Sequence, residues 1–226
     1  MYVIVKEVYM KNIVIINGSP KKDSISEKLA LKFIKALNLD ESNYIYDLIK
    51  LVEMDIKNCI GCLKCKETGI CFHNDEMNRI KDKIKNADLI VFNSPVHISH
   101  ITSIFHNFFE RSIIDLHTFE YKNKPFVNIV STNGSGEEEV DKYLSKMGLL
   151  FGMIKIGFIY ISNNDQFKEN TFKKLVKKTR NILEDKIKIK PTFKNKMYFE
   201  FMKKTIKENL DYFVYENKVW KERGWL

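Results

Sequence analysis

Cysteine is scarce in this chain of 226 residues, and its four copies are not scattered. All of them lie between residues 59 and 71, and the rest of the chain contains none. Chance does not collect all the thiols of a chain in this way, so the cluster indicates one shared ligand. A disulfide pair is the plainest alternative, but a chain inside a cell keeps its thiols reduced.

Long hydrophobic runs are also missing. No run approaches the ~18 apolar residues that are needed to cross a bilayer, so we expect no membrane partner. The apolar first ten residues lack the small-residue cleavage site of a signal peptide, and Met10 is a second candidate start after Met1. We therefore expect a cytoplasmic protein.

Arginine is rare although the chain is basic. The formal net charge is +9, but arginine occurs only at positions 79, 111, 180 and 223. Readers of bases and phosphates favour the forked guanidinium of arginine, whereas scattered lysines suit a solvated helix face. Nucleic-acid binding is therefore disfavoured.

The spacing of the cysteines favours an iron–sulfur cluster. Cys59, Cys62 and Cys65 are separated by two residues each, and Cys71 follows after five more. Such clusters are held by four cysteine thiolates, often as C-x2-C-x2-C with one further cysteine. Structural zinc sites usually use two cysteine pairs that lie roughly a dozen or more residues apart. A cluster, a zinc ion, and structural or redox thiols all stay open on spacing alone.

The first apolar run leads into a segment that suits an anion. Residues 12–17 are typical of a strand buried on both faces, and a turn-rich loop follows over residues 18–24. Ser24 then caps a helix, with Glu27 expected to complete a capping box. The helix start offers free N–H groups to a phosphate, and three hydroxyls add donors: Ser19, Ser24 and Ser26. The alternative to a phosphate site is an ordinary turn with a helix cap. The sequence contains neither the phosphate loop of nucleoside triphosphatases nor a dinucleotide-binding fingerprint.

Strands and helices alternate along the chain. After the first strand, buried runs predict strands over 44–49, 88–92, 126–130 and 155–161. Helical patterns predict helices over 76–86 with Asp75 as cap, over 101–116, from 137 to a stop at Gly152, and over 168–186. This alternation indicates an α/β fold, a flavodoxin-like doubly wound parallel sheet of order 2-1-3-4-5. We expect the polar loops after the first, third and fourth strands to meet at its ligand-binding edge, with the cysteine segment nearby.

The end of the chain differs in composition. We expect residues 1–190 to form the flavodoxin-like domain, with the cysteines as an insertion at 59–71, and residues 191–226 to form an aromatic helical extension. A helix over about 196–215 places several apolar side chains near one face. The aromatic content exceeds what one added helix needs to bury, which favours self-association.

Four motifs resemble those of the NADPH-dependent FMN reductase-like flavoproteins, and more narrowly the iron–sulfur flavoproteins of anaerobes. The family's phosphate loop, Gly-Ser-Pro-Arg-Lys-x-Ser-Asn-Thr, is matched by residues 18–26, and its compact cysteine motif by residues 59–71. Its Ser-Pro-Val-Tyr loop and later Phe-x-Asp-Arg correspond to residues 94–97 and 108–111, and its aromatic tail to residues 220–225. The resemblance covers the chain from the first strand onward.

The resemblance implies an FMN-dependent oxidoreductase that passes electrons between a donor such as NAD(P)H or ferredoxin, FMN and a 4Fe-4S cluster. The cluster ligands would be Cys59, Cys62, Cys65 and Cys71. The FMN phosphate would lie on Ser19, Lys21, Ser24, Ile25 and Ser26. The isoalloxazine would lie against Ser94, Pro95, Val96, His97, Thr132, Asn133, Gly134, Ser135 and Gly136. The cluster often serves the flavin of a neighbouring subunit, so a homodimer or homotetramer is expected.

The loop at residues 94–100 departs from the family pattern. His97 replaces a tyrosine beside the flavin, and Ser99 and His100 replace a Gly-Asn pair, which restricts the loop. His97 is a candidate proton donor, because an imidazole exchanges its proton near neutral pH. A loop histidine bonded to the backbone is the alternative, and a metal site from His97 and His100 is weaker still. Ile25 replaces the usual asparagine of the phosphate loop.

Two rival functions remain at this point. The first is an NAD(P)H-dependent FMN or quinone-type reductase whose cysteines are structural. The second is a zinc-bearing, non-enzymatic binding module on the same fold, without a flavin. For an electron-transfer protein, the basic surface suits an acidic protein carrier, while the motifs leave a small-molecule donor equally open.

Overall fold

In the computed structural model, residues 10–40, 42–162 and 168–226 are described. Residues 1–9, and with them the choice between Met1 and Met10 as the start, lie outside the described residues. The strands are β1 Lys11–Asn17, β2 Tyr44–Lys50, β3 Leu89–Pro95, β4 Pro125–Thr132 and β5 Ile154–Ser162. All neighbours pair in parallel in the order β2-β1-β3-β4-β5, which confirms the predicted flavodoxin-like sheet.

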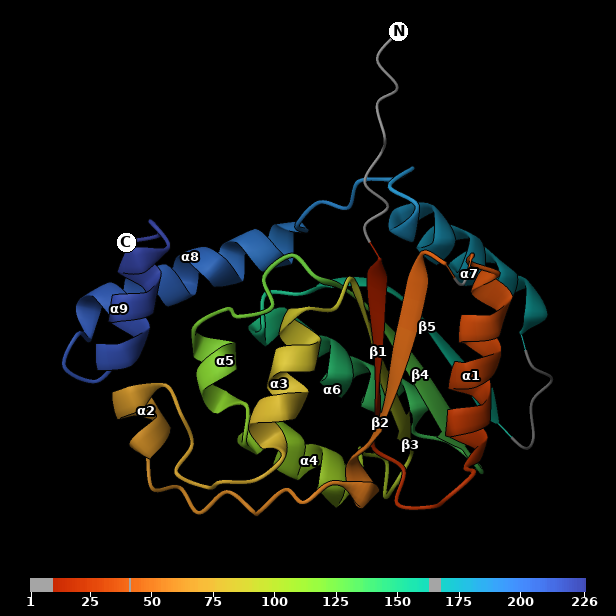
Figure 1. The fold of residues 1–226 in the computed structure, drawn as a ribbon, viewed down its shortest axis with the longest axis horizontal. Coiled ribbons are helices and arrows are strands. Elements are labelled where there is room, and N and C mark those ends of the chain that lie inside the picture. The colour runs from red at the N-terminus through yellow and green to blue at the C-terminus, as the bar shows by residue number, and fades with distance from the viewer. Residues whose placement is uncertain (1–9, 41, 163–167) are drawn as a thin grey trace, which may run out of the picture.

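Helices cover both faces of the sheet. One face carries α1 Ile25–Leu37 and α7 Glu169–Leu183, and the other carries α3 Met77–Lys85, α4 Ser103–Glu110, α5 Ile113–His117 and α6 Glu137–Leu150 (Figure 1). Successive side chains of a strand point to opposite faces. Ile13 and Ile15 of β1 therefore join the core under α1 and α7, while Val14 and Ile16 join the core under α3, α4 and α6. This is why the first strand reads as a continuous apolar run.

Two predicted helices on the second face have different ends in the structure. The helix expected over 101–116 is divided into α4, which Thr102 caps, and α5. Arg111, between them, reaches out to Asp75. Asp75 does not cap α3, which begins at Met77 after Glu76, although its carboxylate accepts from the Met77 amide at 3.1 Å. Gly152, with φ of 78°, follows the end of α6 as predicted.

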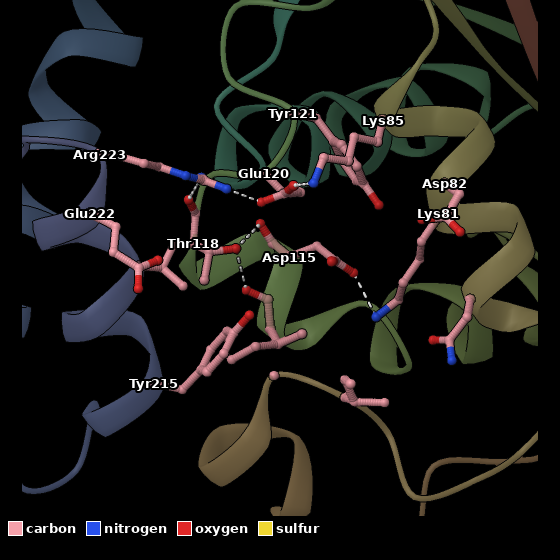
Figure 2. Close-up of a pocket in the computed structure, with 15 residues that line it drawn as sticks. Lys81, Asp82, Lys85, Asp115, Thr118, Glu120, Tyr121, Tyr215, Glu222 and Arg223 are labelled. Carbon is pink, nitrogen blue, oxygen red and sulfur yellow. Dashed lines mark hydrogen bonds and ion pairs between the residues drawn. The ribbon is translucent and has the colours of Figure 1, made fainter.

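The last part of the chain forms two helices, so the single helix expected over 196–215 was wrong. α8 Phe193–Glu208 begins with a capping box of Thr192 and Asn195, and α9 is Val214–Glu222. Trp220 of α9 is fully buried in an aromatic cluster with Phe119. Figure 2 shows the same helix end tied to the body of the protein, where Arg223 pairs with Glu120. Phe213 is buried as well, whereas Phe201 and Tyr212 are each 60% exposed, so part of the aromatic surface that favoured self-association stays uncovered.

The cysteine region contains little regular structure. η1 Leu51–Glu53 follows β2, and α2 Lys64–Thr68 is the only helix assigned between η1 and α3. In the described ranges, no helix is long and apolar enough to cross a membrane.

Candidate functional site

The loop between β1 and α1 is fixed by contacts with β3 and α4. The Gly18 amide donates to the Asn93 carbonyl oxygen at 2.8 Å, and the Gly18 carbonyl oxygen accepts from the Thr102 hydroxyl at 2.7 Å. A Cβ at Gly18 would overlap the Phe105 ring. Only glycine lets the loop lie this close to the start of α4.

Ser24 caps α1 as predicted, but Glu27 does not complete the capping box. The Ser24 hydroxyl accepts from the Glu27 amide at 3.2 Å and lies 3.1 Å from the Ser26 hydroxyl. The Glu27 carboxylate instead accepts from the Asn17 side-chain amide at 2.9 Å and pairs with Lys50 at 2.8 Å. These partners lie on β1 and β2, so the Glu27 carboxylate is held at the sheet and its charge is paired with that of Lys50. The start of α1 is left as a site for an external anion.

A cleft of about 420 Å³ opens between this loop and the loops after β3 and β4. Its volume lies within the range of ligand sites, roughly 300–1,000 Å³. Predicted residues from all three loops line it: Ser19, Lys21, Ser24, Ile25, Pro95, Val96, His97, Thr132 and Asn133. The three loops therefore meet at one edge of the sheet, as expected.

Four further residues of the cleft were not predicted: Pro20, Asp23, Lys28 and Ser131. Lys28 has a signal that sequence reasoning could have used, because it follows the helix cap Ser24 by four residues and so lies one turn further along the same side of the helix. With Lys21 and Lys28 against Asp23, the wall carries a net positive charge, which favours an anion.

The other predicted contacts do not line the cleft: Ser26, Ser94 and Gly136 are buried, and Gly134 and Ser135 are exposed. Ser26 and Ser94 are fully buried. The Thr132 hydroxyl donates to the Ser135 carbonyl oxygen at 3.0 Å and accepts from the Gly134 amide at 3.1 Å. Gly136 has φ of 97° and packs so closely on the 96–99 loop that a Cβ there would press on Val96 and Ser99. Direct cofactor contacts stay predictions for these five residues: Ser26, Ser94, Gly134, Ser135 and Gly136.

His97 is exposed at the cleft and begins a tight turn. Its amide donates to the His100 carbonyl oxygen at 2.8 Å, and the His100 amide donates back at 2.9 Å. Between them Ile98 and Ser99 have φ of 49° and 56°. This is the left-handed region that glycine favours, and a β-branched residue adopts it only under strain. Ser99 stands where the resemblance places glycine, so the departure seen in the sequence has a structural cost.

His100 packs on His106 and Tyr143 rather than on His97. Its Nδ1 lies 2.9 Å from His106 Nε2, the two rings are stacked, and the Tyr143 hydroxyl lies 3.3 Å from His106 Nδ1. Burial, with His100 next to it, lowers the pKa of His106. Sequence reasoning missed this group because its members come from a loop, α4 and α6.

All four cysteines line one narrow cavity of about 50 Å³, together with Glu110 and Arg111. Gly61 and Leu63 have left-handed φ values of 65° and 59°, which bend the segment around the cavity. Burial raises the pKa of the Cys65 thiol, and the neighbouring Cys71 adds to this. Among the residues that the structure describes, no three His, Cys, Asp or Glu side chains converge on one metal ion. The four thiols thus share a cavity without converging on a single point.

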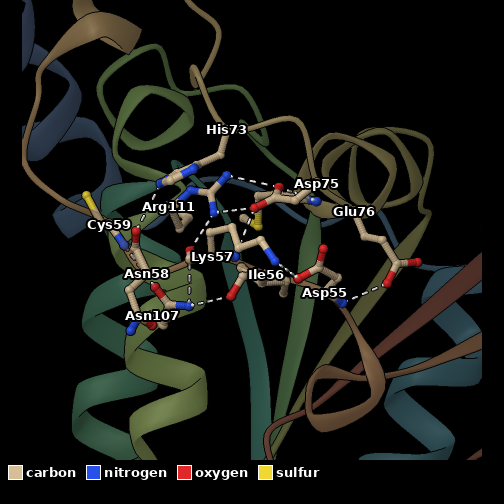
Figure 3. Close-up of polar contacts among 11 residues, drawn as sticks. Asp55, Ile56, Lys57, Asn58, Cys59, His73, Asp75, Glu76, Asn107 and Arg111 are labelled. Carbon is tan, nitrogen blue, oxygen red and sulfur yellow. Dashed lines mark hydrogen bonds and ion pairs between the residues drawn. The ribbon is translucent and has the colours of Figure 1, made fainter.

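The two ends of the cysteine segment are joined by a buried ion pair. Figure 3 shows Arg111 donating to both carboxylate oxygens of Asp75, at 2.6 and 3.0 Å, and to the Lys57 carbonyl oxygen at 2.5 Å. The Lys57 amide donates to the same carboxylate at 2.9 Å. The Arg111 and Asp75 side chains are each only 1% exposed. Asn107 adds a further link, because its side-chain oxygen accepts from the Cys59 amide at 3.3 Å.

α4 connects the cleft to the cysteine segment. Its cap Thr102 and Phe105 contact the Gly18 loop, and Asn107 and Arg111 hold the segment before Cys59. The eight helical residues span about 12 Å. Figure 1 shows that α2 lies beyond α4 and α5 from the β1–α1 loop, and the two cavities share no lining residue. The cysteines are therefore displaced sideways from the cleft, while their segment leaves the sheet at the carboxyl end of β2, as expected.

This fold and cleft define a flavin-dependent oxidoreductase with a flavodoxin-like sheet. The chain belongs to the NADPH-dependent FMN reductase family, whose model matches residues 11–167. An iron–sulfur flavoprotein of Clostridioides difficile is 28% identical over 159 residues, which cover 70% of this chain and 69% of that protein. One from Archaeoglobus fulgidus is 27% identical over 142 residues, covering 62% of this chain and 64% of that protein.

A solved structure shows the same fold. The crystal structure of RosB with bound 8-demethyl-8-formylriboflavin-5'-phosphate matches with a TM-score of 0.64 at 15% identity, covering 77% of this chain and 79% of that one. The matched part spans about two thirds of each iron–sulfur flavoprotein above, so about a third of each has no counterpart in the match.

The residues present fit both groups that the family suggests. The cleft offers a helix start, serine hydroxyls and two lysines to a phosphate. The cysteine cavity offers four sulfur donors beside His73, Glu110 and Arg111, and thiolates are the ligands of iron–sulfur clusters.

Proposed function

We propose that this protein is an electron-transfer flavoprotein that passes electrons between a donor such as NAD(P)H or ferredoxin, FMN and a four-cysteine 4Fe-4S cluster. The observation that carries the proposal is the pairing, in one chain, of this family's cleft with a cavity lined by four cysteines, connected by α4. When bound, FMN takes electrons singly or in pairs and a cluster takes them one at a time.

The β1–α1 loop is proposed to hold the FMN phosphate. Ser19, Lys21, Ser24, Ile25 and Ser26 surround the start of α1, whose N–H groups and dipole attract an anion. Lys28 is added to this set, because it lines the same cleft. The isoalloxazine is proposed to lie against the 94–97 and 132–136 loops, which Gly136 packs together.

His97 is proposed to supply a proton at the cleft through an imidazole nitrogen. It lines the cleft with an exposed side chain, and its backbone is fixed by the turn to His100. His97→Phe is expected to slow electron transfer from NAD(P)H and to change its pH profile. A full rate across the pH range in that variant would leave His97 with a purely structural role.

Self-association is proposed as a homodimer or homotetramer. Four large apolar side chains beside the cysteines are more than half exposed: Ile60, Leu63, Ile70 and Phe72. Exposed apolar patches of this kind mark interaction surfaces. Since the cysteines lie to the side of the chain's own cleft, the flavin of a neighbouring subunit is the proposed electron partner. Light scattering that gives a monomer mass at high concentration would contradict this.

One experiment separates the proposal from its rivals. The protein is purified without oxygen and analysed by absorption spectroscopy and for flavin, iron, acid-labile sulfide and zinc. We expect FMN with iron and sulfide. Flavin without metal would instead support a quinone-type reductase with structural cysteines, and zinc without flavin would support a non-enzymatic module.

A further inference from the structure

The tip of the cysteine segment, which is the short helix α2 and the residues up to Cys71, has few stabilising features of its own. α2 has five residues, and Leu63 before it provides no side-chain cap. Isolated helices of that length are not stable in water. α2 nevertheless carries Cys65, which lines the cavity. Contacts from elsewhere in the chain must therefore hold it.

Lys66 of α2 is buried against aromatic rings that precede α9. Its side chain is 8% exposed, and its ammonium lies 3.0 Å from the centroid of the Tyr212 ring and 4.4 Å from that of Phe213. Within the described part of the chain, Lys66 Nζ has no hydrogen-bond partner. Burying a cation without a hydrogen-bond partner is costly, and attraction to the two ring faces is the contact that compensates for it. The contact ties α2 to residues 212–213.

Gly69 provides a second contact at the other end of α2. Its amide donates to the Cys65 carbonyl oxygen at 2.8 Å, and its φ is 79°. A Cβ at this position would overlap the Tyr215 ring. The tyrosine therefore occupies the space beside Gly69, two residues before Cys71.

α9 is itself anchored to the body of the protein. Trp220 is fully buried, and its indole N–H donates to the His117 carbonyl oxygen at 3.0 Å. As Figure 2 shows, Arg223 pairs with Glu120, which also pairs with Lys85 of α3 at 2.7 Å. A continuous set of contacts thus runs from α3 and α5 through α9 to the tip of the cysteine segment.

We propose that residues 212–222 form a clamp that fixes the cysteine segment, with Lys66 and Gly69 as the positioning residues that it grips. Through them the clamp sets where Cys65 and Cys71 stand. The C-terminal extension thus belongs to the cysteine centre, because it positions two of the four thiols. The proposal rests on the proposed function only for its effect on the iron–sulfur cluster, and its effect on the thiols is independent of any metal.

The first test measures thiol reactivity in the full-length, reduced, metal-free protein. An aromatic disulfide reagent is added, and peptide mass spectrometry follows the modification of Cys65. Lys66→Met removes the cation, and we expect Cys65 to react about tenfold faster, as the loss of a desolvated cation–π contact implies. Tyr212→Ala removes one ring from an exposed position and should act in the same direction. Cys59, which precedes α2, should react at an unchanged rate.

Lys64→Met is the matched control. Lys64 lies on the same helix, but it is exposed and pairs only weakly with Glu67, at 3.7 Å. In Lys64→Met, we expect the rate of Cys65 modification to stay within about twofold of the wild-type rate. Rates within twofold in both Lys66→Met and Tyr212→Ala would overturn the clamp.

A glycine pair gives a second, independent test. Gly69→Ala and Gly61→Ala place a Cβ at the similar left-handed φ values of 79° and 65°, but only the first meets Tyr215. Amide hydrogen exchange of residues 64–71, in the protein as purified, should rise more in Gly69→Ala than in Gly61→Ala. Equal increases in the two variants would show that backbone strain alone is responsible and would contradict the clamp.

The metal readout separates this proposal from the proposed function. After anaerobic reconstitution, iron and acid-labile sulfide per chain should fall in Lys66→Met and Gly69→Ala but not in Lys64→Met. A wild-type protein that takes up neither would defeat the proposed function, while the thiol rates would still decide on the clamp. Normal iron in Lys66→Met together with unchanged thiol rates would defeat the clamp alone.

Discussion

The cleft and the cysteine segment are built by different means. Each wall of the cleft follows directly from a strand, and backbone hydrogen bonds tie it to the next strand, as between Gly18 and Asn93 or Val96 and Ser131. The cysteine segment contains no strand among its described residues. It depends on side chains, with the Arg111–Asp75 pair at its base and the Lys66 contact at its tip. The cleft therefore inherits the stability of the sheet, whereas the cysteine segment can be released by single substitutions.

Among the predictions that test the difference between the two regions, Arg111→Met is expected to have the largest effect on stability. It leaves the Asp75 carboxylate buried without its partner, and breaking a buried pair from one side costs about 3–5 kcal/mol. Urea unfolding should show that loss, and iron content after reconstitution should fall. FMN titration should show that the cleft still binds, because the strands that carry it are untouched.

Arg79→Met is the control for this variant. Arg79 is exposed and pairs with Glu76 on the surface, at 2.9 Å. Its replacement should change the free energy of unfolding by less than about 1 kcal/mol. If Arg111→Met abolished FMN binding as completely as iron binding, the two regions would not be independent.

Gly18→Ala alters the cleft instead of the cysteine segment. The added Cβ overlaps Phe105, and overpacking of this kind costs about 1–3 kcal/mol. The loop must move away from α4, so the dissociation constant for FMN should rise about tenfold, equivalent to about 1.4 kcal/mol. Gly148→Ala places a Cβ against the Phe126 ring, away from the cleft, and should destabilise the fold without weakening FMN binding. Equal losses of affinity in the two variants would show a global effect.

Acid should loosen the base of the cysteine segment. Burial raises the pKa of Asp75, but hydrogen bonds from Arg111 and from the Lys57 and Met77 amides outweigh it and lower the pKa to about 2. Because the folded pKa lies below the ordinary value of about 3.9, the stabilisation is complete above about pH 4 and is lost as the pH falls towards 2. The difference in unfolding free energy between metal-free wild type and Asp75→Asn should shrink over that interval. A constant difference down to pH 2 would contradict the assignment.

The contrast between the two regions also explains what the sequence could predict. Strands, the Ser24 cap and the meeting of three loops follow from local patterns, since apolar runs and turn residues act over a few positions. The break between α4 and α5 does not, because apolar residues continue across it and the break lies at Arg111, whose partner is 36 residues away in the sequence. The sideways position of the cysteines was missed for the same reason. Side-chain contacts between distant segments leave no periodic signal.

Ser24→Ala is the smallest expected effect and compares two helix caps. Ser24 caps α1 at the cleft, and Thr192 caps α8 far from it in the chain. Loss of either cap should cost about 1 kcal/mol of unfolding free energy. FMN affinity should fall only in Ser24→Ala, because its hydroxyl also lies beside Ser26 at the start of α1, where the phosphate is proposed to bind. An unchanged FMN affinity in Ser24→Ala, with the same stability loss as in Thr192→Ala, would reduce Ser24 to a helix cap and would move the proposed phosphate site to the backbone amides and lysines of the loop.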